Sequence, residues 1–186
     1  MKPLPSASAA LRDQLSRGAP PKLAFAQLPG LDLTCARLVE ATLQSANLRG
    51  ARLRCAELVQ ARAQDVILDG ADCSGAHFGA AELSRASFVR AILERASFRK
   101  ATLADANFEG ARMQGASLVH SDCRRVRFVE ADLRGADLRG ARLHGADFSR
   151  AQIEDAHFDE HVRLPWLHAR ATHVFVAGQR VDRPER

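Results

Sequence analysis

The sequence predicts an all-β solenoid, a chain that coils around one long axis, with short non-repetitive segments at its two ends. Three observations carry this prediction. They are an unbroken five-residue period, the regular placement of small and large apolar residues within it, and a second spacing of 20 residues among the phenylalanines. The chain has 186 residues, the size of one ordinary domain.

The five-residue period runs from Ala26 to Glu160 as 27 consecutive units without an insertion. Each unit begins with Ala or a small substitute, and two residues later it carries Leu, Phe or another apolar residue. A helix faces the core about every 3.6 residues and a strand every second residue, so a strict period of five fits neither. It fits a coil that turns a corner after each unit and buries its core against neighbouring repeats.

Three units show the pattern most clearly: Ala46 to Gly50 reads ANLRG, and Ala131 to Gly135 and Ala136 to Gly140 both read ADLRG. They match the consensus A(D/N)LXX, so residues 26–160 resemble the pentapeptide-repeat family. The resemblance implies a right-handed quadrilateral β-helix with four units per coil and about 6.75 coils. Residues that are 20 apart would then stack on one face.

The phenylalanines favour the same grouping by four units. One set at spacings of 20 predicts a ladder of rings inside the coil, and a second set falls on another face: Phe88, Phe108, Phe128 and Phe148, then Phe78, Phe98 and Phe158. Offset ring stacks add roughly 0.5–1.5 kcal/mol per pair beyond the burial of area.

The two ends lie outside the period. Residues 1–25 form an N-terminal segment in which a short helix from Ser8 to about Arg17 could cover the first coil; a mobile tail is the equal alternative. Residues 161–186 are expected to cap the last coil or to form a dimer contact, with a strand, or a hairpin turning near Gly178, over residues 172–181. The candidate contact residues are Trp166, Val174, Phe175 and Val176. Because some family members dimerise through their C-terminal segments, the resemblance favours a homodimer.

Catalytic, cofactor-binding and metal sites are not expected. Glycines stand at unit ends rather than in a phosphate-binding loop, the seven histidines are scattered, and a convex rod offers no deep pocket. Cys35 and Cys55 are 20 apart, so they would stack on adjacent coils as free thiols; a redox or metal role is the alternative.

The net charge of +5 belongs to the ends of the chain. Residues 1–25 and 161–186 each carry +3, which leaves the coil at −1 and makes nucleic-acid binding unexpected. No exposed aromatics interleave with the arginines, as single-strand binders require. No apolar run of membrane-spanning length and no signal-peptide h-region are present. We therefore expect a cytoplasmic protein without membrane contact, and the excess of Arg over Lys indicates a bacterial, GC-rich genome.

Outward cations and valines are the candidate partner-binding residues. A basic belt occupies the last positions of four successive units with one neighbour, a second group follows, and two valines stack on one face: Arg85, Arg90, Arg95, Arg99 and Lys100; Arg124, Arg125 and Arg127; Val39 and Val59. Acidic residues are interleaved with the cations, so pairing within the coil is the alternative to an acidic partner. The valines equally suit strands without a partner.

Two functions follow. The first is a non-enzymatic protein–protein interaction module or scaffold, with a protein partner of unknown identity and no cofactor. The alternative is a modulator or protector of a type II topoisomerase (DNA gyrase), as the resemblance to DNA-mimicking quinolone-resistance proteins implies. A DNA mimic presents a continuous acidic face, and the near-neutral coil disfavours that alternative.

Overall fold

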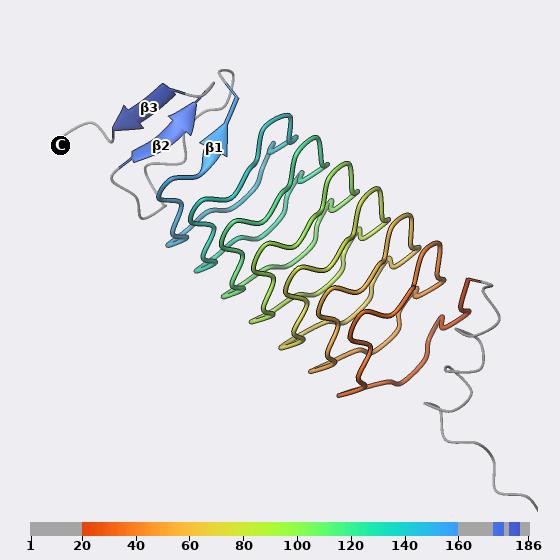
Figure 1. The fold of residues 1–186 in the computed structure, drawn as a ribbon. Coiled ribbons are helices and arrows are strands. Elements are labelled where there is room, and N and C mark those ends of the chain that lie inside the picture. Colours follow the sequence, from red (N-terminus) through yellow and green to blue (C-terminus); the bar gives the residue numbers. More distant parts are fainter. Residues whose placement is uncertain (1–19, 160–172, 177–178, 183–186) are drawn as a thin grey trace, which may run out of the picture.

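The computed structural model describes residues 20–159, 173–176 and 179–182. Residues 20–159 wind into a stack of similar coils (Figure 1). Parallel bridges join residues that are 20 apart, beginning with Lys22 and Thr42 and ending with Asp137 and His157. Four bridging positions recur in each 20 residues, so each coil has four sides. The predicted stacking at intervals of 20 is present, whereas the number of about 6.75 coils stays a prediction.

A hydrogen-bonded turn closes every unit. The amide of Ala51 donates to the carbonyl of Leu48 at 3.0 Å, and Gly50 between them has a φ of +63°. The same positive φ recurs at every fifth residue from Phe25 to Asp155. This is the pattern of a type II turn, whose third residue must be left-handed. Only nine of these residues are glycine and 18 are not, so glycine alone does not impose the conformation.

The hydrogen bonds between coils overcome the cost of the left-handed residues, roughly 1–2 kcal/mol each for a residue with a Cβ. In one unit, the amides of Leu48 and Gly50 donate to the next coil, to Ile67 and Asp69, at 2.8 and 2.9 Å. The amide of Asn47 donates to the preceding coil, to Ala26, at 2.9 Å. Three of the five amides in a unit therefore join coils, and a fourth closes the turn.

The Asp or Asn of the consensus satisfies the fifth amide. The side-chain oxygen of Asn47 accepts from the amide of Arg49 at 3.2 Å, and Asp137 accepts from the amide of Arg139 at 3.1 Å. Short Asx side chains make this bond to the backbone two residues on. The consensus is thus a complete account of the backbone donors of one unit.

The inward residues form one continuous core from Leu23 to Phe158. The ring ladders predicted from the sequence are present: Phe88 and Phe108 stack at 4.7 Å between centroids, and Phe78 and Phe98 at 4.8 Å. The two ladders also meet edge to face, for example Phe78 and Phe88 at 5.8 Å. Phe158 contacts Phe148, at 6.5 Å, rather than the Phe78 ladder.

The predicted N-terminal boundary is wrong by one unit. Residues 21–25, assigned to the N-terminal segment, already belong to the coil. Leu23 is 8% exposed, and the carbonyl of Pro21 accepts from the amide of Thr42 at 3.0 Å. Pro21 and Phe25 stand where the pattern has a small residue and a turn residue, which conceals this unit in the sequence. The helix expected from Ser8 lies outside the described residues.

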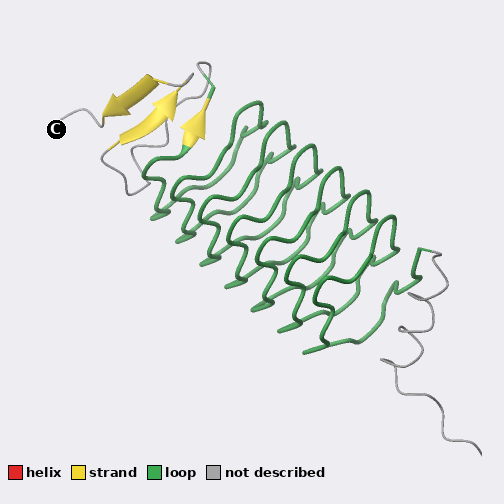
Figure 2. Cartoon of the chain, viewed as in Figure 1, coloured by secondary structure: helices red, strands yellow, loops and turns green. Residues whose placement is uncertain are grey.

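Three short strands form a mixed sheet at the C-terminal end (Figure 2): β1 (His157–Phe158), β2 (His173–Val176) and β3 (Gln179–Asp182). β2 pairs in parallel with β1, and β3 pairs antiparallel with β2. These antiparallel strands agree with a hairpin near Gly178, although residues 177–178 are not described. Val174, Phe175 and Val176 lie in β2, and Trp166 lies outside the described residues, so the role of this end as cap or dimer contact stays a prediction.

The stacked rings generate a stability prediction. Phe108→Ala removes a fully buried ring that stacks on Phe88 and Phe128. We expect a loss of about 3–5 kcal/mol in the free energy of unfolding, measured by denaturant titration. Phe108→Leu is the matched control, since leucine fills the same column at Leu48 and Leu68. Equal losses in the two variants would contradict a contribution from ring stacking.

Candidate interaction surface

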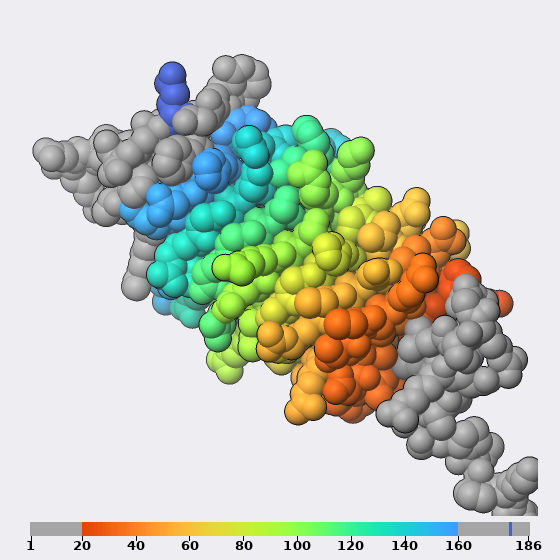
Figure 3. Space-filling view, in the orientation of Figure 1, coloured from red at the N-terminus to blue at the C-terminus, as the bar shows by residue number. Residues whose placement is uncertain are grey.

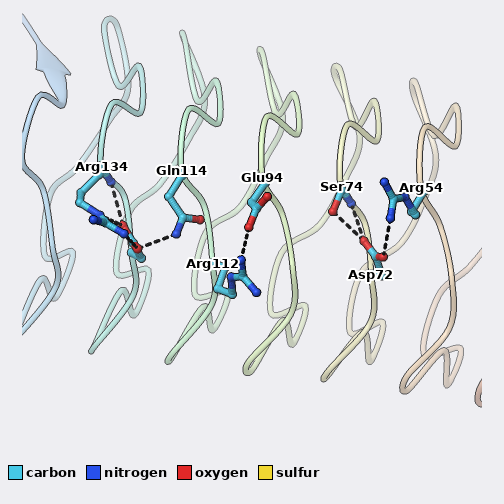
Figure 4. Close-up of polar contacts among 8 residues, drawn as sticks. Arg54, Asp72, Ser74, Glu94, Arg112, Gln114 and Arg134 are labelled. Atoms are coloured by element: carbon cyan, nitrogen blue, oxygen red, sulfur yellow. Dashed lines mark hydrogen bonds and ion pairs between the residues drawn. The ribbon is translucent and has the colours of Figure 1, made fainter.

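Charged side chains on the second face are paired. This face comprises the units ending at the residues 35, 55, 75, 95, 115, 135 and 155. Figure 4 shows Arg54 beside Asp72 at 3.7 Å, Arg112 bonded to Glu94, and Gln114 and Arg134 converging on the carboxylate of Asp132. These contacts join adjacent coils or residues within a unit. The face therefore offers few free charges to a partner.

An alternating column of charges follows one corner of the coil. Arg85 donates to Asp65 at 2.7 Å, and Arg125 donates to Asp105 at 2.6 Å. The hydrogen bond from Arg85 holds the pKa of Asp65 below its ordinary value, and Arg125 has the same effect on Asp105. Arg85, a member of the predicted belt, is thus committed to an intramolecular pair.

The second predicted basic group is also paired. Arg124 contacts Asp122 at 2.6 Å, Arg125 contacts Asp105, and Arg127 contacts Glu109 at 2.9 Å. The expectation that Arg124, Arg125 and Arg127 present free positive charge is not supported by these contacts. The physical reason is the coil spacing, which brings residues 18 or 20 apart within reach of one another.

The remainder of the belt differs. Arg90, Arg95, Arg99 and Lys100 are exposed, and within the described part of the chain none of them has an ion-pair partner. The stem of Arg95 lies along the rod beside Gly115, where a Cβ added to the glycine would stand 3.7 Å from the Cγ of Arg95. The structure thus divides the belt into one paired cation and four unpaired cations.

Three of these four cations gather at the third face, which comprises residues 36–40, 56–60, 76–80, 96–100, 116–120, 136–140 and 156–159. Arg95 stands at the corner where this face begins, and Arg99 and Lys100 lie on it. The three central units, 76–80, 96–100 and 116–120, contain no Asp or Glu. We call Arg95, Ser97, Arg99, Lys100 and Ser117 the cationic patch.

The valine candidates lie on the same face but contribute little free surface. Val39 and Val59 are half-buried, and Val119 further along is 6% exposed. The Cγ2 atom of Val59 lies 3.9 Å from the Cβ position of Gly79, so this valine packs along its own column. A role for Val39 and Val59 in partner binding stays a prediction.

The cysteines divide as the spacing predicts. Cys35 and Cys55 are exposed free thiols at turn positions, whereas Cys73 and Cys123 are buried. Burial raises the pKa of the Cys123 thiol to about 12, which makes it inert. Within the described residues, no group of three or more His, Cys, Asp or Glu side chains could hold a metal ion. The described residues also contain no helix of the length and apolarity needed to span a membrane.

A shallow hollow at the corner between the third and fourth faces was not foreseen from the sequence. It has a volume of about 450 Å³ and is lined by Glu40, Thr42, Gln60, Arg62, Ala80 and Glu82. The signal was present in the corner column, where Ala80 is short between Gln60 and Lys100. Its lining carries both signs of charge. Figure 3 shows how closely the outward side chains cover the rest of the visible coil surface.

The described coil defines a solenoid that presents side chains on flat faces. Family models for pentapeptide repeats match residues 22–54, 32–70 and 56–95, and a model of the pentapeptide repeat region matches residues 81–158. The chain therefore belongs to the pentapeptide-repeat family. Members of this family form right-handed quadrilateral β-helices and are in general structural or interaction proteins.

Solved structures of the same family resemble this chain. HetL of Nostoc sp. strain PCC 7120, involved in the regulation of heterocyst differentiation, is 26% identical over 81% of each chain, with a TM-score of 0.46. A thylakoid-lumen protein of Arabidopsis thaliana is 31% identical over 47% of this chain and 68% of its own, with a TM-score of 0.33. QnrB1, a plasmid-mediated fluoroquinolone resistance protein, is 16% identical over 85% of each chain, with a TM-score of 0.45. No curated protein matches the sequence.

A glycine beneath the third face yields a second prediction. A Cβ at Gly140 would stand 2.0 Å from Nδ1 of His120, whereas a Cβ at Gly135 meets no atom within 4 Å. Both glycines have a positive φ, +72° and +66°, so alanine is strained at either position. We expect Gly140→Ala to displace the His120 ring and to lower stability by about 1 kcal/mol more than Gly135→Ala.

Thermal or denaturant unfolding measures this difference, and the His120→Ala background supplies the control. There Gly140→Ala and Gly135→Ala should cost the same, because the ring is gone. A difference that persists without the ring would contradict the contact.

The paired carboxylates predict loss of stability in acid. The hydrogen bond from Arg139 lowers the pKa of Asp137, and the bond from Arg124 lowers the pKa of Asp122, each against the opposing effect of burial. A carboxylate whose folded-state pKa is lowered stabilises the fold above its ordinary pKa, and this contribution is lost as pH falls through the folded-state pKa. We expect the melting temperature to fall below about pH 4.

Arg139→Gln is the variant that isolates one pair. It should reduce stability at neutral pH by at most about 1 kcal/mol, because the pair is partly exposed. It should also weaken the dependence of the melting temperature on pH in acid. An unchanged acid profile would contradict a stabilising role for the pair with Asp137.

Proposed function

We propose that this protein is a non-enzymatic interaction module whose coil binds a protein partner through the four unpaired cations of the belt. The observation that carries the proposal is the contrast in charge pairing. The cations Arg85, Arg124, Arg125 and Arg127 form ion pairs within the coil, whereas Arg90, Arg95, Arg99 and Lys100 are exposed without one among the described residues.

Unpaired surface charge supports a binding function for a physical reason. Charges that are already paired have little to gain from a partner, while free cations attract acidic surfaces and speed encounter. The backbone beneath Arg95, Arg99 and Lys100 is fixed by bonds such as Lys100 N to Val119 O at 3.0 Å. A rigid backbone loses little conformational entropy on binding.

Self-association through residues 161–186 is part of the proposal, as is a cytoplasmic location in a bacterium. In the order β1-β2-β3, β3 stands at the outer edge, and no other described strand pairs with it there. The unpaired backbone of an edge strand readily pairs with another chain. A second copy of β3 would satisfy it.

The topoisomerase alternative gains no support from the charges. A protein that mimics DNA needs an acidic surface, while the free charge on the described coil is basic and most acids on it are paired. Inhibition or protection of DNA gyrase in a supercoiling assay would reopen this alternative.

Affinity capture from the native host tests the proposed function. The bait is the full chain, compared with the variant in which Arg90, Arg95, Arg99 and Lys100 are all changed to Glu. We expect the wild type to retain a specific protein that the variant loses, while the two melt at similar temperatures because no described pair is broken. Retention of the same proteins by both baits would contradict the proposal.

A further inference from the structure

We infer that the cationic patch on the third face binds a carboxylate-rich segment of a protein partner. This inference rests on the proposed interaction function and adds to it the face that binds and the chemistry of the partner. It separates Arg95, Arg99 and Lys100 from Arg90, which stands one corner away at the end of unit 86–90.

The patch consists of hydrogen-bond donors that have no intramolecular acceptor. Arg95 and Arg99 each carry five N–H donors and Lys100 carries three. Ser97 and Ser117 are half-buried, and neither hydroxyl makes a hydrogen bond within the described part of the chain. Carboxylates are acceptor groups only, and charge-assisted bonds to them are about twice as strong as neutral ones.

The spacing of the patch suits a peptide. Phe78 and Phe98, which lie beneath this face, stack at 4.8 Å, so Ser97 and Ser117 are separated by about the same rise. Ser97 and Arg99 are two residues apart on an extended strand, roughly 6.6 Å. Carboxylates on one side of an extended peptide, or at positions i and i+4 of a helix, have spacings of about 5–7 Å.

Acidic residues limit the patch in both directions along the rod. The nearest carboxylates on the third face are Glu57 and Asp137, four coils apart, or roughly 19 Å. A nucleic-acid backbone that followed the rod would meet negative charge at both limits, and it needs about 6–10 phosphate contacts for strong binding. A short acidic peptide fits between them, so the observations favour a protein segment over a nucleic acid.

The test uses the full chain and three fluorescent probes: a decapeptide of alternating Glu and Ser, its Gln and Ser counterpart, and a 20-base-pair DNA duplex. The triple variant Arg95→Glu, Arg99→Glu and Lys100→Glu is compared with Arg90→Glu. Arg90 is the matched control, since it is an exposed, unpaired cation of the same coil on another corner. Backbone amide chemical shifts in NMR spectra locate the binding.

We expect the Glu peptide to shift amides in 95–100 and 115–120, and the Gln peptide to shift none. The triple variant should weaken binding of the Glu peptide at least about tenfold and Arg90→Glu by less than about twofold. Equal weakening per reversed charge in the two variants, or shifts centred elsewhere, would overturn the inference. Tighter binding of the duplex than of the Glu peptide would overturn it in favour of nucleic acid.

The host capture experiment separates this inference from the proposed function. A specific partner that survives the triple reversal but is lost when Arg90 is also reversed leaves the interaction module in place and overturns the third-face assignment. Peptide binding at the patch without any specific host partner overturns the proposed function and leaves the carboxylate assignment standing.

Discussion

The left-handed residue at the end of each unit is the constraint on which the structure depends. It recurs at every fifth residue from Phe25 to Asp155, and it turns the backbone so that four units close one coil. Eighteen of these residues carry a Cβ and are strained. Hydrogen bonds to the adjacent coils offset the strain, which makes each coil depend on its neighbours, as in other solenoids.

This dependence decides what the surface can display. Because coils stack in register, an outward residue lies beside the residue 20 positions away, and opposite charges at that spacing pair, as Arg85 does with Asp65. Most of the charge is neutralised in this way. The patch around Arg99 and Lys100 stands out because its neighbours at that spacing are Gly79, Ala80, Val119 and His120. Specificity on such a rod arises from columns in which pairing fails.

The sequence predicted most of the fold because the period is written directly in the inward residues. It predicted the ring ladders at intervals of 20, but not the edge-to-face contact of Phe78 with Phe88, which depends on how the coil closes. It misplaced the first unit, because Pro21 and Phe25 do not resemble the consensus. It named the cations of the belt but could not divide them, since pairing depends on side-chain reach between coils. The C-terminal strand pairing likewise involves contacts that no local pattern encodes.

The central claim is that a five-residue register, closed every 20 residues, holds the chain together. The free energy of unfolding tests it most directly in two insertion variants made after Gly110: one extra alanine, or a second copy of residues 91–110. The longer insertion preserves the register and should leave the free energy unchanged or raise it. The single alanine breaks the register of every later coil and should lower it by several kcal/mol. A single-alanine variant as stable as the wild type would contradict the account.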